Sequence, residues 1–155
     1  MINKFKNNRG MTVNVICAVL MAILLVLQFV PFWHYGEAGE SCSISGYIWF
    51  PSDHKELESW LISQAEDHDL NSFVGMPILV LVLSVVGSIF CLLKADQNWV
   101  GLFPLACGAA GAVAYLTIPA LRLGVGWTWH LLLCIVLAVL GGYGLMQQVK
   151  EMKSV

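Results

Sequence analysis

Four long apolar segments, separated by short polar links and one long polar loop, constrain the fold of this chain most strongly. They cover about residues 11–32, 73–93, 99–121 and 127–146. About 20 helical residues cross the ~30 Å hydrocarbon core of a bilayer, and all four segments reach that length. Charged residues make up only 12% of the chain, against roughly 25% in soluble domains. The sequence therefore predicts an all-α integral membrane protein, with residues 1–155 forming a single four-transmembrane-helix bundle.

The first apolar segment also allows a second interpretation. It follows a basic start and precedes a small-residue stretch at Gly36-Glu37-Ala38, as a secretory signal peptide does. The apolar core of a signal peptide is typically ~7–15 residues long, and this segment is longer. We therefore expect a retained helix.

The distribution of lysine and arginine predicts the orientation in the membrane. Basic residues are enriched in the cytoplasmic segments of multi-pass proteins. With the N-terminus inside, six basic residues lie inside and two, Lys55 and Arg122, lie outside. The sequence thus predicts a plasma-membrane protein with cytoplasmic N- and C-termini. The loop at residues 33–72 is then extracellular, and its eight acidic residues are Glu37, Glu40, Asp53, Glu56, Glu58, Glu66, Asp67 and Asp69.

The composition of this loop predicts a small folded cap. Residues 43–50 are β-branched and aromatic, so they predict a strand that pairs with residues near 33–35 across a glycine-rich turn. Asp53 and Glu56 have the spacing of a capping box at a helix start. Leu57, Trp60 and Leu61 then fall on one helical face. We expect an extracellular β-hairpin plus a short helix between helices 1 and 2.

Small residues in the apolar segments predict close helix packing, because membrane helices associate through small side chains. The third segment is richest in them. Two functional alternatives stay open for such surfaces, subunit contact and a pore lining. No charged residue or histidine lies in the middle of a segment, which argues against an active transporter but leaves a channel possible. The candidate packing residues are Gly108, Gly111, Ala112, Ser84, Ser88 and Gly141.

Histidines and one cysteine on the predicted outer side are candidate metal ligands. Imidazole, carboxylate and thiolate suit zinc or copper. Their spacing follows no established metal motif, so we expect solvated histidines, and no cofactor. The candidates are His34, His54, His68 and Cys42. Cys42 has no external cysteine partner, so a free thiol or an intermolecular bridge is expected there.

Docking of the cap on the helices is the remaining predicted interaction. Arg122 at the outer end of the third segment could pair with the acidic loop, and Trp33, Trp49 and Trp60 are the candidate apolar contacts. The chain shows no catalytic constellation and no basic stripe for nucleic acid.

The layout resembles that of the claudin-like four-helix membrane proteins. The residues that carry the resemblance are Pro31-Phe32-Trp33 and Gly46-Tyr47-Ile48-Trp49, which are similar to the tryptophan and Gly-Leu-Trp of that family's first extracellular loop. The family motif continues with two disulfide-bonded cysteines, and no cysteine follows Trp49 in this loop. The resemblance implies lateral self-association and partner contacts through the external loop.

These observations together predict a non-enzymatic membrane protein that acts in assembly or partner interaction. It would use its acidic cap and small-residue helix faces, with the bilayer and either copies of itself or another membrane protein as partners. The alternatives are an oligomeric channel or transporter accessory subunit, and an extracellular metal or ligand sensor.

Overall fold

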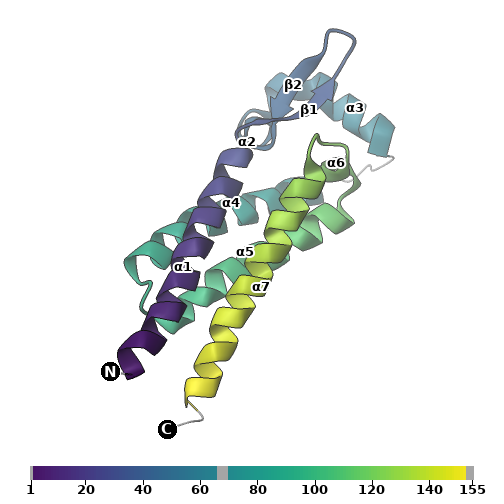
Figure 1. Cartoon of the computed structure of the whole chain (residues 1–155). Helices are drawn as coiled ribbons and strands as arrows, with labels where there is room; N and C mark the ends of the chain where they lie inside the picture. The colour runs from purple at the N-terminus through teal and green to yellow at the C-terminus, as the bar shows by residue number, and fades with distance from the viewer. Residues whose placement is uncertain (1, 66–69, 153–155) are drawn as a thin grey trace.

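Four long helices form the body of the molecule in the computed structural model, which describes residues 2–65 and 70–152. They are α1 (Ile2–Leu27), α4 (Leu70–Leu93), α5 (Leu102–Thr117) and α7 (Trp127–Met152). Helices α1 and α5 each pack against both α4 and α7, and a small folded cap closes one end (Figure 1). All four contain segments long and apolar enough to cross a membrane: Gly10–Leu27, Gly75–Leu93, Trp99–Thr117 and Trp127–Gln147. The predicted four-helix bundle is confirmed.

The first helix ends earlier than the apolar pattern predicts. The expected segment ran to residue 32, but α1 stops at Leu27 and loosens into a turn. In this turn the amide of Gln28 donates to the carbonyl of Leu25 at 3.1 Å, and the amide of Val30 donates to that of Leu27 at 3.3 Å. Pro31 follows, and proline disfavours helical conformation at the residue before it. The apolar pattern alone therefore does not predict where α1 ends.

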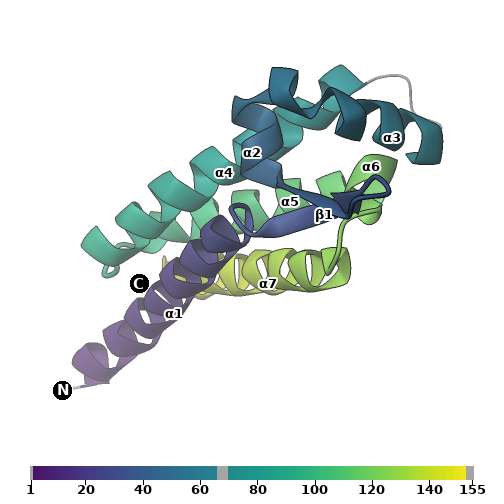
Figure 2. The ribbon, with the colours of Figure 1, turned by 90° about the horizontal axis from the view of Figure 1, so that it is seen from above.

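The cap comprises residues 31–65 and contains the predicted two-stranded sheet and helix. Strands β1 (Pro31–Tyr35) and β2 (Glu40–Ser43) are antiparallel, and Tyr35 pairs with Glu40 next to the turn. Gly36 and Gly39 in that turn both adopt positive φ, which glycine tolerates at little cost. A short helix α2 (Ile44–Trp49), a 3₁₀ turn η1 (Pro51–His54) and helix α3 (Lys55–Ala65) complete the cap (Figure 2).

The strand predicted at residues 43–50 is wrong for most of its length. Ser43 ends β2, and residues Ile44–Trp49 are helical instead. The hydroxyl of Ser43 accepts a hydrogen bond from the amide of Gly46 at 2.9 Å, which caps α2. Ile44 and Tyr47 are buried on one side of α2. Burial and the cap outweigh the β propensity of these residues, which is strongly dependent on context.

The third apolar segment is broken near its end, where the sequence predicts one helix to residue 121. It begins as the 3₁₀ turn η2 (Asn98–Gly101) and continues as α5. Ile118 is then extended, and Pro119 starts the separate short helix α6 (Pro119–Arg122). Proline lacks the amide that would continue α5 and suits the first position of a new helix. The break turns α6 toward the cap, where it contacts α3.

Glycines bring α5 and α7 into backbone contact. A β-carbon on Gly108 would clash with the carbonyl of Cys134 and the amide of Ala138 on α7. A β-carbon on Gly141 would lie 2.5 Å from the amide of Leu105 on α5. Such close approach is the usual role of small residues between membrane helices. At these two positions the small residues lie between helices of the same chain.

The other candidate packing residues lie around this contact. Gly111 is buried against the thiol of Cys134, and Ala112 is partly buried. The hydroxyl of Ser84 is buried, donates to the carbonyl of Val80 at 2.7 Å and lies 3.4 Å from the Cys107 sulfur. Ser88 donates to its own helix at the carbonyl of Val85. Gly111 and Ser84 therefore lie between helices, whereas the Ser88 hydroxyl bonds within α4.

Asn14 holds the end of the bundle opposite the cap. Its side-chain amide is buried and donates to the carbonyl of Ala95 at 2.8 Å, in the link between α4 and α5. A buried polar group must be hydrogen-bonded to avoid a desolvation penalty. This bond between α1 and a turn 81 residues away therefore positions the link against the middle of α1.

Candidate functional site

The most elaborate arrangement of polar and aromatic groups lies where the cap meets the bundle. Phe32 and Trp33 of β1 are fully buried there, with exposed fractions of 1% and 0%. The indole N–H of Trp33 donates to the carbonyl of Ala120 in α6 at 3.0 Å. That carbonyl lies in the short helix that Pro119 separates from α5. The break in the third segment thus presents an acceptor to the cap.

Phe32 packs into a space that a glycine provides. A β-carbon on Gly124 would clash with the Phe32 ring. The amide of Val125 donates to the Phe32 carbonyl at 2.6 Å, so the chain before α7 runs beside the start of β1. The Phe32 ring meets the rings of Trp33 and His130 edge to face, with centroids 4.9 and 5.1 Å away. Such aromatic pairs contribute about 0.5–1.5 kcal/mol each beyond area burial.

His130 is buried in this aromatic environment near the start of α7. Its Nδ1 lies 3.1 Å from the carbonyl of Gly126, so Nδ1 carries the proton and donates. Its Nε2 is buried and has no hydrogen-bond partner among the described residues. The rings of Phe32 and Tyr115 surround it. We refer to Phe32, Trp33, Tyr115 and His130 as the junction cluster.

Gln28 adds a second buried acceptor beside the junction cluster. Its Oε1 has no hydrogen-bond partner in the described part of the chain, and its side chain is 2% exposed. Together with Ile44 of α2, Pro77 of α4 and Tyr115 of α5, it lines a cavity of about 10 Å³. That volume is near the minimum for one water molecule. The residue after α1 and residues of α2, α4 and α5 therefore meet around a small, mainly apolar void that contains the Gln28 side chain as its polar group.

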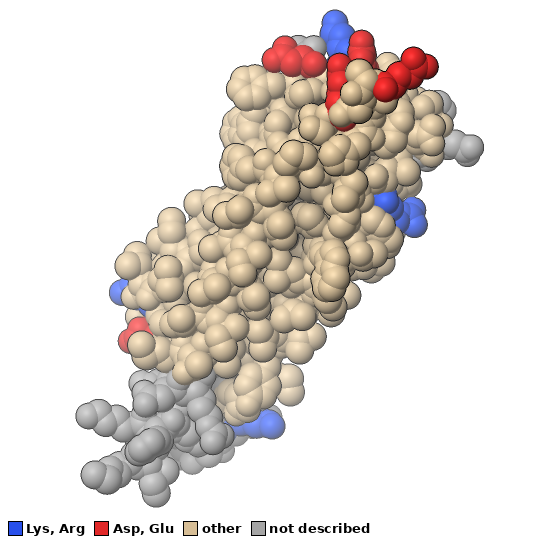
Figure 3. Space-filling model, turned by 45° about the horizontal axis from the view of Figure 1, so that its top comes forward, with Lys and Arg blue, Asp and Glu red and all other residues tan. Residues whose placement is uncertain are grey.

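Carboxylates gather on the surface of the cap that faces away from the bundle (Figure 3). Lys55 is the one basic residue among the described cap residues. Glu66, Asp67, Asp69 and the candidate ligand His68 fall outside the described residues. The described carboxylates of this acidic surface are Glu37, Glu40, Asp53, Glu56 and Glu58.

The candidate metal ligands are not assembled into a site. No group of three histidine, cysteine, aspartate or glutamate side chains suited to a metal occurs within the described residues. His34 is exposed, and His54 Nδ1 lies 3.5 Å from the Tyr35 hydroxyl. Cys42 and His54 both lie near Gly46, where a β-carbon would be 3.6 Å from Cys42 Sγ and 4.0 Å from His54 Nε2. Two side chains are brought close, and no third ligand joins them among the residues that the structure describes, which leave out His68.

Cys42 is buried in the cap. All five cysteines of the chain are free and buried, and Cys42 Sγ donates to the Ser43 carbonyl at 3.2 Å. Burial raises the pKa of the Cys42 thiol above its ordinary value of 9.0. A buried, protonated thiol is a poor partner for disulfide exchange. The structure thus offers no accessible sulfur at this position for the bridge between copies that the sequence left open.

The four candidate docking residues have different surroundings. Trp33 docks the cap on α6, and Trp60 is half-buried on α3 against the core of the cap. Trp49 is exposed at the end of α2. Arg122 is also exposed and makes no ion pair within the described ranges. Aromatic packing and the Trp33–Ala120 and Val125–Phe32 hydrogen bonds dock the described part of the cap, while Glu66, Asp67 and Asp69, as possible partners of Arg122, lie outside it.

Sequence reasoning missed most of the junction. The apolar pattern places Phe32 in a membrane helix, and it does not single out Tyr115, Ala120 or Gly124. One available signal was Pro31, which marks the end of α1 and frees Phe32 to enter the cap. Another was Gly124, where the absence of a side chain accommodates the Phe32 ring.

The fold defines a helical bundle of the multi-pass membrane type, with a cap docked on one end by buried aromatic side chains. Comparisons of this chain with protein-family models, with curated proteins and with solved structures find no match.

Proposed function

We propose that this chain is a non-enzymatic, multi-pass plasma-membrane protein that holds an acidic extracellular surface rigidly above the bilayer for a cationic partner. The observation that carries the proposal is the junction. The cap is fastened to the bundle by the Trp33–Ala120 and Val125–Phe32 hydrogen bonds and by the buried Phe32 ring. An element fixed in this way presents its outer groups at a constant position, which lowers the entropy cost of binding.

The charge of the acidic surface favours a partner other than a second cap. The described cap residues carry five carboxylates and one lysine. Two such surfaces repel one another, whereas complementary potentials steer a cationic surface into contact. The partner is therefore expected to present lysine and arginine to Glu37, Glu40 and their neighbours.

The glycine contacts support this proposal over the channel alternative. Gly108 and Gly141 are in backbone contact between α5 and α7 of one chain. Those positions are consequently used in holding the bundle together. A channel lined by them would require this contact to open.

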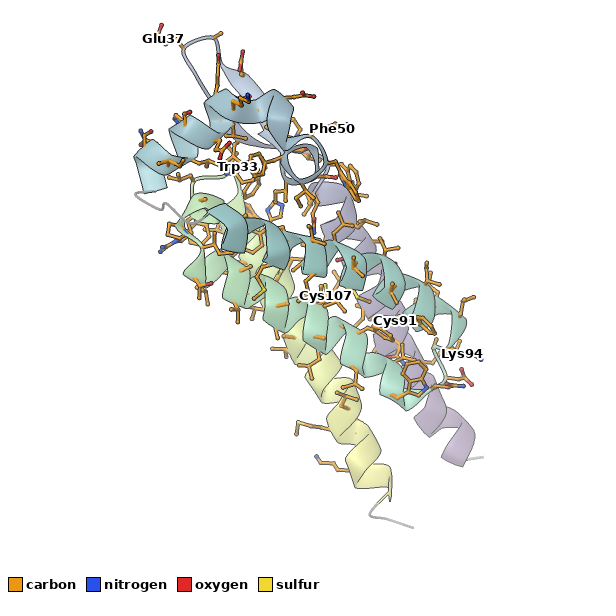
Figure 4. The ribbon with its side chains drawn as sticks, turned by 180° about the vertical axis from the view of Figure 1, so that it is seen from behind. Trp33, Glu37, Phe50, Cys91, Lys94 and Cys107 are labelled. Carbon is orange, nitrogen blue, oxygen red and sulfur yellow. The ribbon has the colours of Figure 1, made fainter. Side chains whose placement is uncertain are left out.

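The orientation in the proposal rests on the separation of charge along the molecule. Lys94 follows the end of α4, at the end of the bundle away from the cap (Figure 4), and Lys150 lies in the last turn of α7. Basic residues favour the cytoplasmic side. This distribution supports the proposed orientation, in which the start of α1 and the end of α7 face the cytoplasm and the acidic surface faces outward.

Site-specific photo-cross-linking tests the proposal. A photoreactive residue at Ala38, in the turn beside Glu37, is expected to form an adduct in native membranes. The combined changes Glu37→Gln, Glu40→Gln and Glu56→Gln should abolish the adduct, and raised salt should weaken it, because exposed charges are screened. Neutralising Lys94 and Lys150 is the matched control and should leave the adduct intact.

Three results would count against the proposal. An adduct that survives neutralisation of the carboxylates would remove the electrostatic basis of recognition. An adduct formed only between copies of this chain would replace the cationic partner by self-assembly. Ion flux through liposomes containing the purified chain alone would move the assignment to a channel.

A further inference from the structure

Two large aromatic side chains are exposed at the base of the cap. Trp49 at the end of α2 is 64% exposed, and the adjacent Phe50 is 62% exposed. Phe29, just beyond the end of α1, is 60% exposed. Phe50 lies beside the outer end of α1, whereas Glu37 lies at the far tip of the cap (Figure 4). The cap thus has an acidic outer surface and an aromatic base.

Two contacts set the height of α2 relative to the apolar bundle. The amide of Ser45 donates to the carbonyl of Gln28 at 2.9 Å, one residue after the apolar segment of α1 ends at Leu27. Ile44 lines the same cavity as Val80 of α4. Val80 is five residues inside the apolar segment that starts at Gly75, or about 7.5 Å along the helix. The first turn of α2 therefore lies level with the outer ends of the apolar segments.

The short length of α2 then limits how far its aromatic end can lie from that level. Trp49 follows Ser45 by four residues, which is about 6 Å along a helix axis. The interfacial layer on each side of the hydrocarbon core is about 5–8 Å thick. Even an α2 directed straight away from the bilayer would keep Trp49 within this layer.

We infer that Trp49 and Phe50 insert into the headgroup–acyl boundary of the outer leaflet and anchor the base of the cap to phospholipid. The inference rests on the membrane placement in the proposed function. Tryptophan prefers this boundary because its ring is apolar and its indole N–H finds polar partners there. Phe29 and Val30, just beyond the end of α1, are exposed as well. The anchor keeps the acidic surface directed away from the lipid.

Site-directed spin labelling can test this arrangement directly. All five native cysteines are buried, so a thiol-specific nitroxide reports on an introduced cysteine. The label is placed by Phe50→Cys in nanodiscs of zwitterionic phospholipid. Val139→Cys, in the middle of α7, provides the lipid reference because Val139 is 64% exposed. Glu37→Cys at the tip of the cap provides the aqueous reference.

The measured quantity is the accessibility of each nitroxide to oxygen, which concentrates in lipid, relative to a water-soluble nickel chelate. The ratio at Phe50→Cys is expected to be several-fold higher than at Glu37→Cys and lower than at Val139→Cys. A ratio equal to that at Glu37→Cys would overturn the inference. A label at Phe50→Cys could also be inaccessible to both reagents. If its spectrum then reports greater mobility as the protein is diluted into lipid, Trp49 and Phe50 would be assigned to a contact between copies of the chain instead.

The same three labels separate failure of this inference from failure of the proposed function. If the accessibility ratio indicates lipid at Val139→Cys and water at Phe50→Cys, only the inferred anchor is wrong. If Val139→Cys itself reads as water, the membrane placement fails and the anchor fails with it. The acidic-surface proposal is tested independently by the cross-linking at Ala38.

Discussion

The indole N–H of Trp33 lies 3.0 Å from the carbonyl oxygen of Ala120, 87 residues further along the chain, and donates a hydrogen bond to it. This bond joins the first strand of the cap to the short helix after the proline break in the third apolar segment. Trp33 is fully buried, so water cannot replace the bond. Docking of the cap therefore depends on this pair.

Replacement of Trp33 by phenylalanine is expected to weaken the docking of the cap. The change removes the donor, leaves the Ala120 carbonyl unpaired and creates a void, which costs about 1–3 kcal/mol. Faster hydrogen exchange of the β1 and β2 amides should report the loss. Trp129→Phe on α7 is the matched control, because Trp129 is 71% exposed and exposed substitutions change stability by about 0.5 kcal/mol or less. Equal exchange in both variants would rule out a docking role for Trp33.

Gly108→Ala is expected to destabilise the bundle. The added methyl would clash with the Cys134 carbonyl and the Ala138 amide, which are backbone atoms that cannot rotate away. Overpacking of this kind costs about 1–3 kcal/mol, measurable as a lower midpoint of unfolding in mixed detergent micelles. Gly144→Ala on α7 is the control, because a β-carbon there meets nothing within 4 Å. An unchanged midpoint for Gly108→Ala would contradict the close helix contact.

Stability of the cap is expected to fall at alkaline pH. Burial raises the pKa of Cys42 above 9.0, and burial followed by the charge of Glu58 raises that of Tyr47 above 10.0. A raised folded-state pKa means that unfolding releases a proton above the unfolded pKa. The stabilisation of the fold by each protonated group is therefore complete below about pH 9. As pH rises further, it decreases by up to about 1.4 kcal/mol per pH unit for each group.

The Cys42→Ala variant isolates one part of this dependence. Its free energy of unfolding should decrease less steeply between about pH 8 and pH 10 than that of the unaltered chain, since one titrating group is gone. Denaturant titrations at each pH, with protease accessibility of the cap as readout, provide the comparison. Parallel pH profiles for the two proteins would show that the Cys42 thiol ionises as easily in the folded cap as in the unfolded chain.

Asn14→Leu is expected to loosen the link between α4 and α5. The substitution removes the donor to the Ala95 carbonyl and leaves that carbonyl unpaired, at a cost of about 1–3 kcal/mol. Thr117→Val is the matched control, because Thr117 is exposed and donates within α5 to Val113 at 2.7 Å. Limited proteolysis between α4 and α5 should be faster in Asn14→Leu alone. Protection of this link in both variants would argue against the Asn14 contact as its anchor.

The sequence pattern was sufficient for the main elements but not for their ends. Hydropathy located all four long helices, and the glycine-rich turn located the hairpin. The spacing of Leu57 and Leu61 identified the buried face of α3, where both side chains are fully buried. Each of these features depends on residues close together in the chain. The end of α1 and the break at Ile118 lie beside Pro31 and Pro119, local signals that hydropathy does not contain. The helical conformation of α2 depends in addition on burial of Ile44 and Tyr47, which the local pattern does not specify.

The candidate site was predictable only in its composition. The sequence identified an acidic loop, and the structure places the described carboxylates on the outer surface of the cap (Figure 3). It also suggested Trp33 as a docking residue, and its indole bonds to Ala120. It did not identify Phe32, Gln28 or His130 as neighbours of this contact. Gln28 and Phe32 lie close to Trp33 in the chain, but the contact of the Phe32 ring with His130 joins β1 to α7, which is far away in the sequence.

The sequence by itself determined four apolar helices, an acidic loop and the small residues that allow helices to approach, because hydropathy and side-chain size belong to individual residues. Only the tertiary structure decided what those residues contact. Gly108 meets α7, Phe32 fills the space beside Gly124, and Cys42 is buried within the cap. The physical reason is that burial and hydrogen bonding depend on which distant backbone and side-chain atoms meet, and local periodicity does not specify those pairs.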